Sequence, residues 1–392
     1  MRLPHKPIAH GASAAVLVVV TAVHVSCSLP HLGREVGDGG YATRAMIDGP
    51  AGLAVIEHAV YVAEMERAQI RRIDLATGII TTVTTSTPLD GTLSLSADYL
   101  GRLLVVEHSR VSRVDPRTGA VSTIAGIGTP GATGDGGPAT EAKLWIPSGC
   151  TTDAQGNLYI ADSAAKRIRR VDAQSGTIST FAGTGRNETS GDGGPAGQAS
   201  FEFPNSVAVD DAGNVYVAQS GDGPSSDRIR RVDAASGVVT TVAGPETTVW
   251  LTDTERQTGI RRPFELVFDR KGGLLFIDPE RGQVFRLDLA SGDVRLLAGG
   301  GMSPADGAAA LVRLANPSAL AVTPDGAVIV AEYVGNRVRR IDMASGRITT
   351  LGGNGKPKRT YVILWLSFQA RLARPNRRLQ PTAANATLSR RG

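Results

Sequence analysis

Acidic residues recur at one position of this sequence, each at the end of a short apolar run. Carboxylate oxygens gathered in a ring could hold Ca²⁺ or attract a cationic ligand, since Ca²⁺ takes oxygen ligands in proteins. An arginine follows each position closely, so pairing of each acid with an arginine of its own segment is the alternative, and the repetition favours it. The equivalent positions are Glu64, Glu107, Asp162, Gln219, Asp278 and Glu332.

Histidines and nucleophiles offer little further chemistry. The Glu-His pairs are Glu57-His58, in a predicted turn, and Glu107-His108, next to an acidic position. His108 could reach a ligand face, although a solvated surface histidine is the alternative. A nucleophile elbow or a Ser/His/Asp arrangement is not visible. The residues suited to chemistry are therefore mainly carboxylates.

A short motif recurs six times and shows which elements must position these acids. It reads IRRID (70–74), VSRVD (111–115), IRRVD (168–172), IRRVD (229–233), VFRLD (284–288) and VRRID (338–342). A turn ending in Gly and an alternating β-type run follow each copy, and a second hairpin precedes each. Units of four antiparallel strands, about 40–60 residues long, are typical of propeller blades. The sequence predicts an all-β, six-bladed β-propeller.

The repeat resembles the NHL repeat of exported bacterial proteins. The resemblance rests on stretches such as GNLYIAD and RIRRVD with its Gly turn, and on the GDGGPA linkers at 134–139 and 191–196. It covers 37–355, with blades at about 37–86, 87–128, 134–185, 191–244, 245–301 and 303–355. Residues that recur in every blade are predicted to be structural: Asp172 anchors its turn, and Asp135 and Asp192 hold inter-blade turns.

Departures from the repeat are the better candidates for a site. Asn205 and Glu265 stand near the start of the first strand of blades four and five, where other copies have Ser, Gly or Ala, and this strand lines the channel of a propeller. Gluconolactonase-like relatives hold a divalent cation with Glu, Asn and Asp, which Glu265, Asn205, Asp162 and Asp278 could imitate. Amidating-lyase relatives hold zinc through histidines of several blades, but His31, His58 and His108 are not at equivalent positions.

The resemblance says little about activity, because this fold hosts scaffolds, ligand binders, lactonases and lyases alike. We expect a non-catalytic protein- or ligand-binding module with no cofactor, and the alternative is a divalent-metal-dependent lactonase or lyase with carboxylates in the channel. The resemblance implies a ligand face bearing the b–c turns and d–a linkers. The ligand-face candidates are Glu64, Glu107, Asp162, Asp278, Glu332, Asn205 and Glu265.

The two ends of the chain differ from the repeats. Residues 1–27 are typical of an export signal, with Arg2 and Lys6 before an apolar run, and Cys27 is a candidate for lipidation. A linker spans 28–36. The basic tail, 356–392, is expected to be disordered or non-native. We predict a periplasmic, envelope-anchored or secreted protein, attached to the membrane through Cys27 if lipidated; Cys150 is predicted to be a small buried apolar residue.

The charge distribution bears on the partners. All 37 acidic residues lie in 28–355, whereas the tail holds nine basic residues and no acid. The propeller is therefore mildly acidic despite the isoelectric point of 9.4, which argues against nucleic-acid binding. A protein or glycan partner is expected instead.

Overall fold

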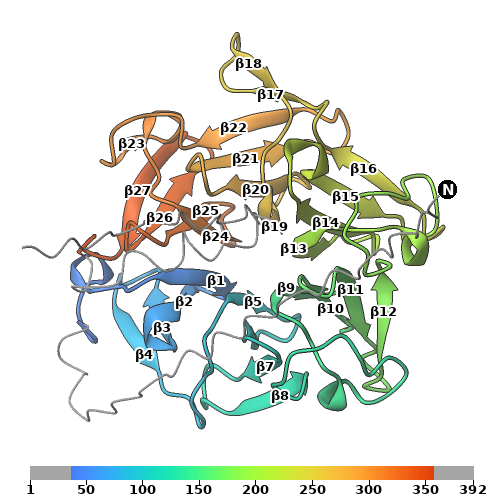
Figure 1. Cartoon of the computed structure of the whole chain (residues 1–392). Helices are drawn as coiled ribbons and strands as arrows, with labels where there is room; N and C mark the ends of the chain where they lie inside the picture. Colours follow the sequence, from blue (N-terminus) through green and yellow to red (C-terminus); the bar gives the residue numbers. More distant parts are fainter. Residues whose placement is uncertain (1–36, 357–392) are drawn as a thin grey trace, which may run out of the picture. The chain divides into compact units, whose positions relative to one another are not determined.

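The computed structural model describes residues 37–356, which form six four-stranded antiparallel sheets arranged as the blades of a propeller around a central channel (Figure 1). Within each blade the strands follow one another in sequence order, and the first strand, here called strand a, lies at the channel. Strands b, c and d follow toward the rim. The all-β, six-bladed architecture predicted from the repeat is confirmed.

The strands of the first three blades have the following bounds: β1 (Pro50–Ile56), β2 (Ala59–Glu64), β3 (Gln69–Asp74) and β4 (Ile80–Val83); β5 (Ser94–Ala97), β6 (Leu103–Val106), β7 (Val111–Val114) and β8 (Val121–Ala125); β9 (Pro147–Thr152), β10 (Leu158–Asp162), β11 (Arg167–Val171) and β12 (Ile178–Ala182). Those of the last three are β13 (Phe203–Val209), β14 (Val215–Ser220), β15 (Arg228–Val232) and β16 (Val239–Ala243); β19 (Phe264–Phe268), β20 (Leu274–Asp278), β21 (Gln283–Leu287) and β22 (Val294–Ala298); β24 (Pro317–Val322), β25 (Val328–Glu332), β26 (Arg337–Asp342) and β27 (Arg347–Gly352).

Short elements lie outside these four-stranded sheets. Blade five carries an extra hairpin, β17 (Thr248–Trp250) and β18 (Arg256–Thr258), whose first strand pairs in parallel with β22. In blade six β23 (Gly307–Ala308) pairs with β27. The 3-10 helices are η1 (Ala42–Arg44), η2 (Met65–Arg67), η3 (Ala139–Glu141), η4 (Ala196–Gln198), η5 (Pro224–Ser226) and η6 (Ala309–Leu311). The β17–β18 hairpin could not be predicted from the repeat. It stands where the linkers at 134–139 and 191–196 have a glycine-rich sequence.

The hydrophobic core consists of separate clusters between adjacent blades. One cluster, for example, joins Ile73 and Ile80 of blade one to Ile329 and Val338 of blade six. A four-stranded sheet with apolar side chains on both faces cannot bury them alone, so each blade requires its two neighbours. This requirement explains why central strands such as β10, LYIAD, are buried along their whole length.

The segment 37–46 closes the ring. Its sequence, GDGGYATRAM, matches the start of the linkers at 134 and 191, and Tyr41 forms an antiparallel bridge with Ile79 at the rim of blade one. From blade six, the Gly353 N–H donates to the Ala42 carbonyl at 2.9 Å. Among residues 37–356 the ring thus closes through an inter-blade linker, and each four-stranded blade sheet is built from consecutive strands of its own repeat.

A buried arginine ties each such linker to its blade. The first arginine of the repeated motif is fully buried in four blades, as Arg71, Arg169, Arg230 and Arg339. Each pairs with the aspartate of the preceding linker: Arg71 with Asp38 at 2.6 Å, Arg230 with Asp192 at 2.7 Å, Arg339 with Asp306 at 2.9 Å, and Arg169 with Asp135. The prediction that Asp135 and Asp192 hold the inter-blade turns is therefore confirmed.

The second arginine and the closing aspartate of the motif stabilise the c–d turn. Asp172 accepts hydrogen bonds from the backbone N–H groups of Gln174 and Ser175, and its other oxygen pairs with Arg170 at 3.2 Å. These bonds lower the pKa of Asp172, with the Ser175 N–H contributing most. The predicted turn-anchoring role of this aspartate is confirmed.

The signal, Cys27, the 28–36 linker and the tail from residue 357 onward lie outside the described residues. Within residues 37–356 there is no apolar helix long enough to span a membrane.

Candidate functional site

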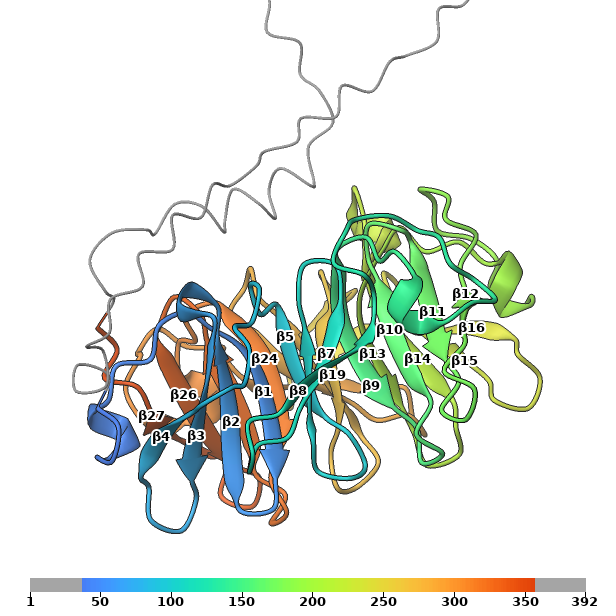
Figure 2. The same ribbon diagram turned by 90° about the horizontal axis from the view of Figure 1, so that it is seen from below.

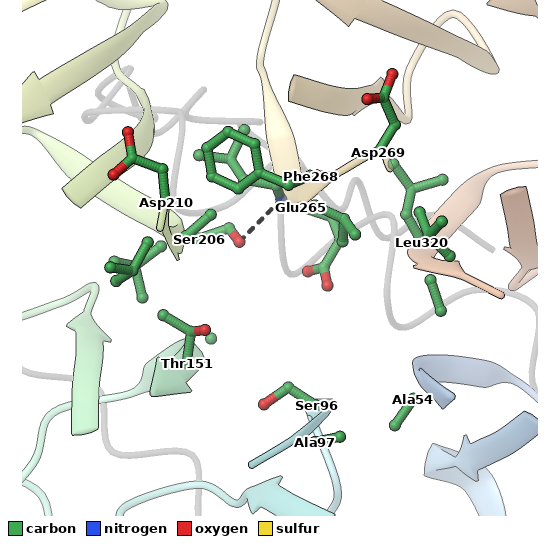
Figure 3. Close-up of a pocket in the computed structure, with 18 of the residues that line it drawn as sticks. Ala54, Ser96, Ala97, Thr151, Ser206, Asp210, Glu265, Phe268, Asp269 and Leu320 are labelled. Atoms are coloured by element: carbon green, nitrogen blue, oxygen red, sulfur yellow. Dashed lines mark hydrogen bonds between the residues drawn. The ribbon is translucent and has the colours of Figure 1, made fainter. Parts of the chain in front are cut away.

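The central channel contains a cavity of about 800 Å³, which is the candidate site (Figure 3). All six a strands line it, mainly with small or aliphatic side chains such as Ala54, Ser96, Thr151 and Leu320. The a–b turns of blades four and five, at 210–212 and 269–272, complete the lining. The cavity therefore extends toward the a–b turns, whereas the resemblance implied a ligand face at the b–c turns and d–a linkers.

Glu265 is the one ionisable carboxylate on the described strands of the channel wall. Its side chain points into the channel from the start of β19 (Figure 3), and only 9% of the residue is exposed. Within 37–356 its carboxyl makes no hydrogen bond or salt bridge. Burial alone raises its pKa to about 8, since desolvation disfavours the charged form.

The backbone of β19 explains how so large a side chain enters the channel. The residue just before the first core residue of strand a is small in the other blades: Gly52, Ser94, Gly149, Ser206 and Ala319. In β19 the pairing register shifts between Phe264 and Leu266, so Glu265 is the bulged residue. Its φ of 49° lies in the left-handed region, which is unusual and strained for a residue with a side chain.

Asn205 occupies a different position from Glu265, although the sequence predicted both at the start of strand a. Asn205 lies one place earlier, and its amide donates to the Pro263 carbonyl of blade five at 3.3 Å and to Ser220 at 2.9 Å. The equivalent Ser148 and Ser318 likewise donate to the next blade, at the Pro204 and Pro50 carbonyls. This position joins neighbouring blades, so the Asn205 amide has a structural role.

The predicted carboxylates at the ends of the b strands do not form an open ring. They are all buried, with at most 1% of each residue exposed. The alternative, pairing within the blade, is confirmed: Glu64 lies 3.7 Å from Arg71, Asp162 3.5 Å from Arg169, Glu332 3.4 Å from Arg339, and Glu107 2.8 Å from Arg110. In blade four Gln219 instead bonds to Thr189 and to the Ser226 carbonyl.

Blade five departs from this arrangement, because Phe285 replaces the buried arginine. Asp278 is left with Arg281, 3.8 Å away on the surface side, and one of its carboxylate oxygens has no hydrogen-bond partner within the described part of the chain. The pKa of Asp278 is raised, chiefly by burial. Burial also raises the pKa of the neighbouring Asp227 to about 6. This buried pair was not predicted from sequence; the Phe in place of Arg was the available signal.

The four candidate metal ligands are not brought together. Glu265 lies in the channel, the Asn205 amide joins two blades, and Asp162 and Asp278 lie at the ends of their own b strands. Across residues 37–356, no group of three or more His, Cys, Asp and Glu side chains is placed to hold a metal ion. His108 is exposed and lies 3.9 Å from Asp90.

Cys150 lies in the channel wall on β9 and is buried, as predicted. The Ser96 hydroxyl donates to its backbone carbonyl at 2.9 Å. Burial is the main cause that raises the pKa of the thiol to about 12. A thiol that is so rarely ionised is a poor nucleophile, which fits the predicted role of a small apolar residue.

Comparison with known sequences supports the assignment of the repeat. The family model of the teneurin NHL domain matches residues 126–190. The chain is 27% identical over 291 residues to Protein SUPPRESSOR OF QUENCHING 1, chloroplastic, of Arabidopsis thaliana, covering 69% of this chain and 27% of that protein. It is 26% identical to Teneurin-1 of Caenorhabditis elegans, covering 70% of this chain and 11% of that one. The chain thus spans about a quarter or less of the length of these relatives.

Solved structures show the same fold at low sequence identity. A Bacteroides thetaiotaomicron protein of unknown function matches with a TM-score of 0.57 and 18% identity, over 78% of this chain and 72% of that one. An auxiliary nutrient binding protein of the same organism gives 0.53 and 14%, over 81% and 75%. A Xanthomonas campestris gluconolactonase gives 0.51 and 12%, over 78% and 88%. Fold and repeat together define a six-bladed β-propeller. The chain is similar to NHL-repeat propellers in its repeat and in its fold.

Proposed function

We propose that this propeller is a non-catalytic binding module that takes a small ligand into its central channel. The observation that carries the proposal is the buried carboxyl of Glu265, the one carboxyl on the described strand wall of a channel that also presents small polar and aliphatic side chains. A concave cavity in which a few placed polar groups stand among apolar side chains is typical of ligand sites. The strained φ of Glu265 supports the same interpretation, because strain of this kind clusters at functional positions.

The surroundings of Glu265 favour binding over catalysis. A catalytic nucleophile is commonly activated by an adjacent base or by a lowered pKa, and the Glu265 carboxyl has a raised pKa and no hydrogen-bond partner among residues 37–356. Cys150, the other ionisable residue of the strand wall, has a pKa raised to about 12. The acids of the neighbouring turns have structural bonds: Asp210 accepts from Asn214 and Tyr216, and Asp269 from Arg286. Among solved propellers of this fold are both a nutrient binding protein and a gluconolactonase, so the fold itself is neutral on this point.

The proposal is tested by blocking the channel. The full chain is screened against a panel of small metabolites, and binding is measured as a shift of the melting temperature. Ala97→Phe adds an aromatic ring at the channel wall (Figure 3). Ala235→Phe, on an exposed turn, is the matched control. We expect a stabilising ligand whose effect is lost in Ala97→Phe and kept in Ala235→Phe; ligands that stabilise both variants equally contradict a channel site.

The alternative is the metal-dependent lactonase or lyase. Glu265 would be its channel ligand, since it is the one of the four candidates that lines the cavity. Elemental analysis of the purified chain and melting before and after a chelator test this function, together with lactone hydrolysis. A stoichiometric divalent ion, with turnover that Glu265→Gln abolishes, would replace the binding proposal by the enzymatic one.

We also propose that the chain is exported and lipidated at Cys27, and that a protein or glycan partner binds the assembled propeller. The signal-like run at 11–23 and the mildly acidic propeller support this setting. Cell fractionation of the wild type and of Cys27→Ser tests the anchor. We expect the wild type in the membrane fraction and the variant in the soluble exported fraction; identical distributions would refute lipidation.

A further inference from the structure

We infer that the channel ligand is an organic cation, of the ammonium or guanidinium class, whose charged group pairs with Glu265. The inference rests on the proposed binding function and adds the chemical class of the ligand. It starts from the charges around the cavity. The ionisable groups that line it are four acids, Glu265, Asp210, Asp211 and Asp269, and one base, Arg270, besides the thiol of Cys150.

The balance of charge at the turns favours cations further. The Arg270 guanidinium lies beside the Thr323 carbonyl of blade six, at 3.5 Å, and so is turned toward the next blade. Asp211 is exposed at the channel mouth. Asp269 is paired with Arg286 at 2.6 Å, so the acids at the mouth that no salt bridge offsets within residues 37–356 are Asp210 and Asp211. Acidic groups beside low-dielectric walls attract ligands of positive charge.

The composition of the strand wall distinguishes an organic cation from a metal ion. Ca²⁺ takes six to eight oxygen ligands, and Glu265 is the one carboxylate on the described strand wall. Aliphatic residues such as Leu320 and Val322, and Phe268, are also part of the cavity lining. A body of carbon atoms with one positive group satisfies both features, because the body buries apolar surface while the charge pairs with Glu265.

Glu265 also provides a distinctive signature of such binding. Burial is the single cause of its raised pKa, and the strands packed against β19, namely β13, β14, β20 and β24, add no ionised group to the cavity lining. A carboxyl with a pKa of about 8 is mostly protonated at neutral pH unless a cation is bound beside it. A cation binds its ionised form, so binding releases a proton. Affinity should then increase with pH until the free carboxyl is ionised at about pH 8.

The experiment uses choline, whose charge does not titrate, and its neutral isostere 3,3-dimethylbutan-1-ol. Binding to the full chain is measured by calorimetry at pH 6, 7 and 8.5. We expect the wild type to bind choline at least about tenfold more tightly than the isostere at pH 8.5, and choline affinity to increase about tenfold between pH 6 and 7. In Glu265→Gln both the preference and the pH dependence should disappear. Asp211→Asn, at the mouth, should retain the pH dependence.

The outcomes separate this inference from the binding function. Equal binding of choline and the isostere, or a preference that survives in Glu265→Gln, overturns the cation class. If a neutral ligand, such as the isostere, binds the wild type but not Ala97→Phe, the channel is a ligand site. In that case the binding function stands and only the assignment of the ligand as a cation is wrong. No measurable binding of choline at pH 8.5 refutes the class as well, and failure of the whole metabolite panel refutes the binding function with it.

Discussion

At the scale of single residues, Glu265 combines two features that destabilise the folded state, a buried carboxyl and a strained backbone. Its carboxyl is buried and has no hydrogen-bond or salt-bridge partner among residues 37–356, and its backbone adopts a positive φ at the bulge in β19. The other blades avoid both costs by placing Gly, Ser or Ala at this position. Such a local departure from an otherwise consistent repeat is where function is expected to lie.

The raised pKa of Glu265 predicts a pH-dependent stability. In the folded chain the pKa is about 8, above the ordinary value of 4.5, so the folded state holds a proton that the unfolded state releases. This stabilising contribution is complete below pH 4.5 and is lost as the pH rises to about 8, at up to ~1.4 kcal/mol per pH unit. Glu265→Gln keeps the size and backbone strain of the side chain but cannot ionise.

Urea unfolding at pH 5 and at pH 8.5 measures the effect. We expect the free energy of unfolding of Glu265→Gln to exceed that of the wild type by more at pH 8.5 than at pH 5. Asp211→Asn, which changes an exposed acid, should show no such divergence. If wild type and Glu265→Gln differ equally at the two pH values, the carboxyl is already ionised in the folded protein.

At the scale of elements, each blade is attached to the preceding linker through a buried guanidinium. Arg169 pairs with Asp135 of the linker and with Asp162 of its own β10, and all three anchor points belong to different segments. Arg170, the next residue, is partly exposed and pairs with Asp172 of the c–d turn. Arg169 therefore connects the linker to strand β10, whereas the salt bridge of Arg170 is local to the c–d turn.

Replacing each arginine by methionine tests this difference. Arg169→Met leaves Asp162 as an unpaired buried acid and should cost about 3–5 kcal/mol of unfolding free energy. Arg170→Met removes a surface pair and should cost less than about 1 kcal/mol. Denaturant unfolding of the two variants gives both values. Similar costs would show that burial of the guanidinium adds nothing beyond the turn.

The elements could be predicted from the sequence far better than the site. Alternating apolar residues and glycine turns define the hairpins, so the six blades follow from the pattern alone. Glu265 could be named as a departure, but its isolation depends on the β19 bulge and on the distances to other strands, which no local pattern encodes. The acids at 64, 107, 162, 278 and 332 were attractive as ligands only until their arginines were located in space.

At the scale of the whole molecule, the linker at 37–46 has the same form as the linkers inside the chain. It pairs with the rim of blade one, accepts the Gly353 N–H of blade six, and contains an aspartate bonded to a buried arginine. Blades one and six lie side by side (Figure 2), and the linker between them has the form of the linkers at 134 and 191.

This equivalence means that the position of the chain ends within the ring is arbitrary. A circular permutant that joins residue 356 to residue 37 and opens the exposed linker at 128–133 should fold to the same propeller, because it moves one break from one linker to another. We expect its circular dichroism spectrum to match that of the parent and its melting temperature to fall by only a few degrees. A permutant that fails to fold would show that blade one must begin the assembly. A permutant that folds would show that the inter-blade linkers are interchangeable. The propeller would then tolerate one break in the backbone at a linker other than the natural one.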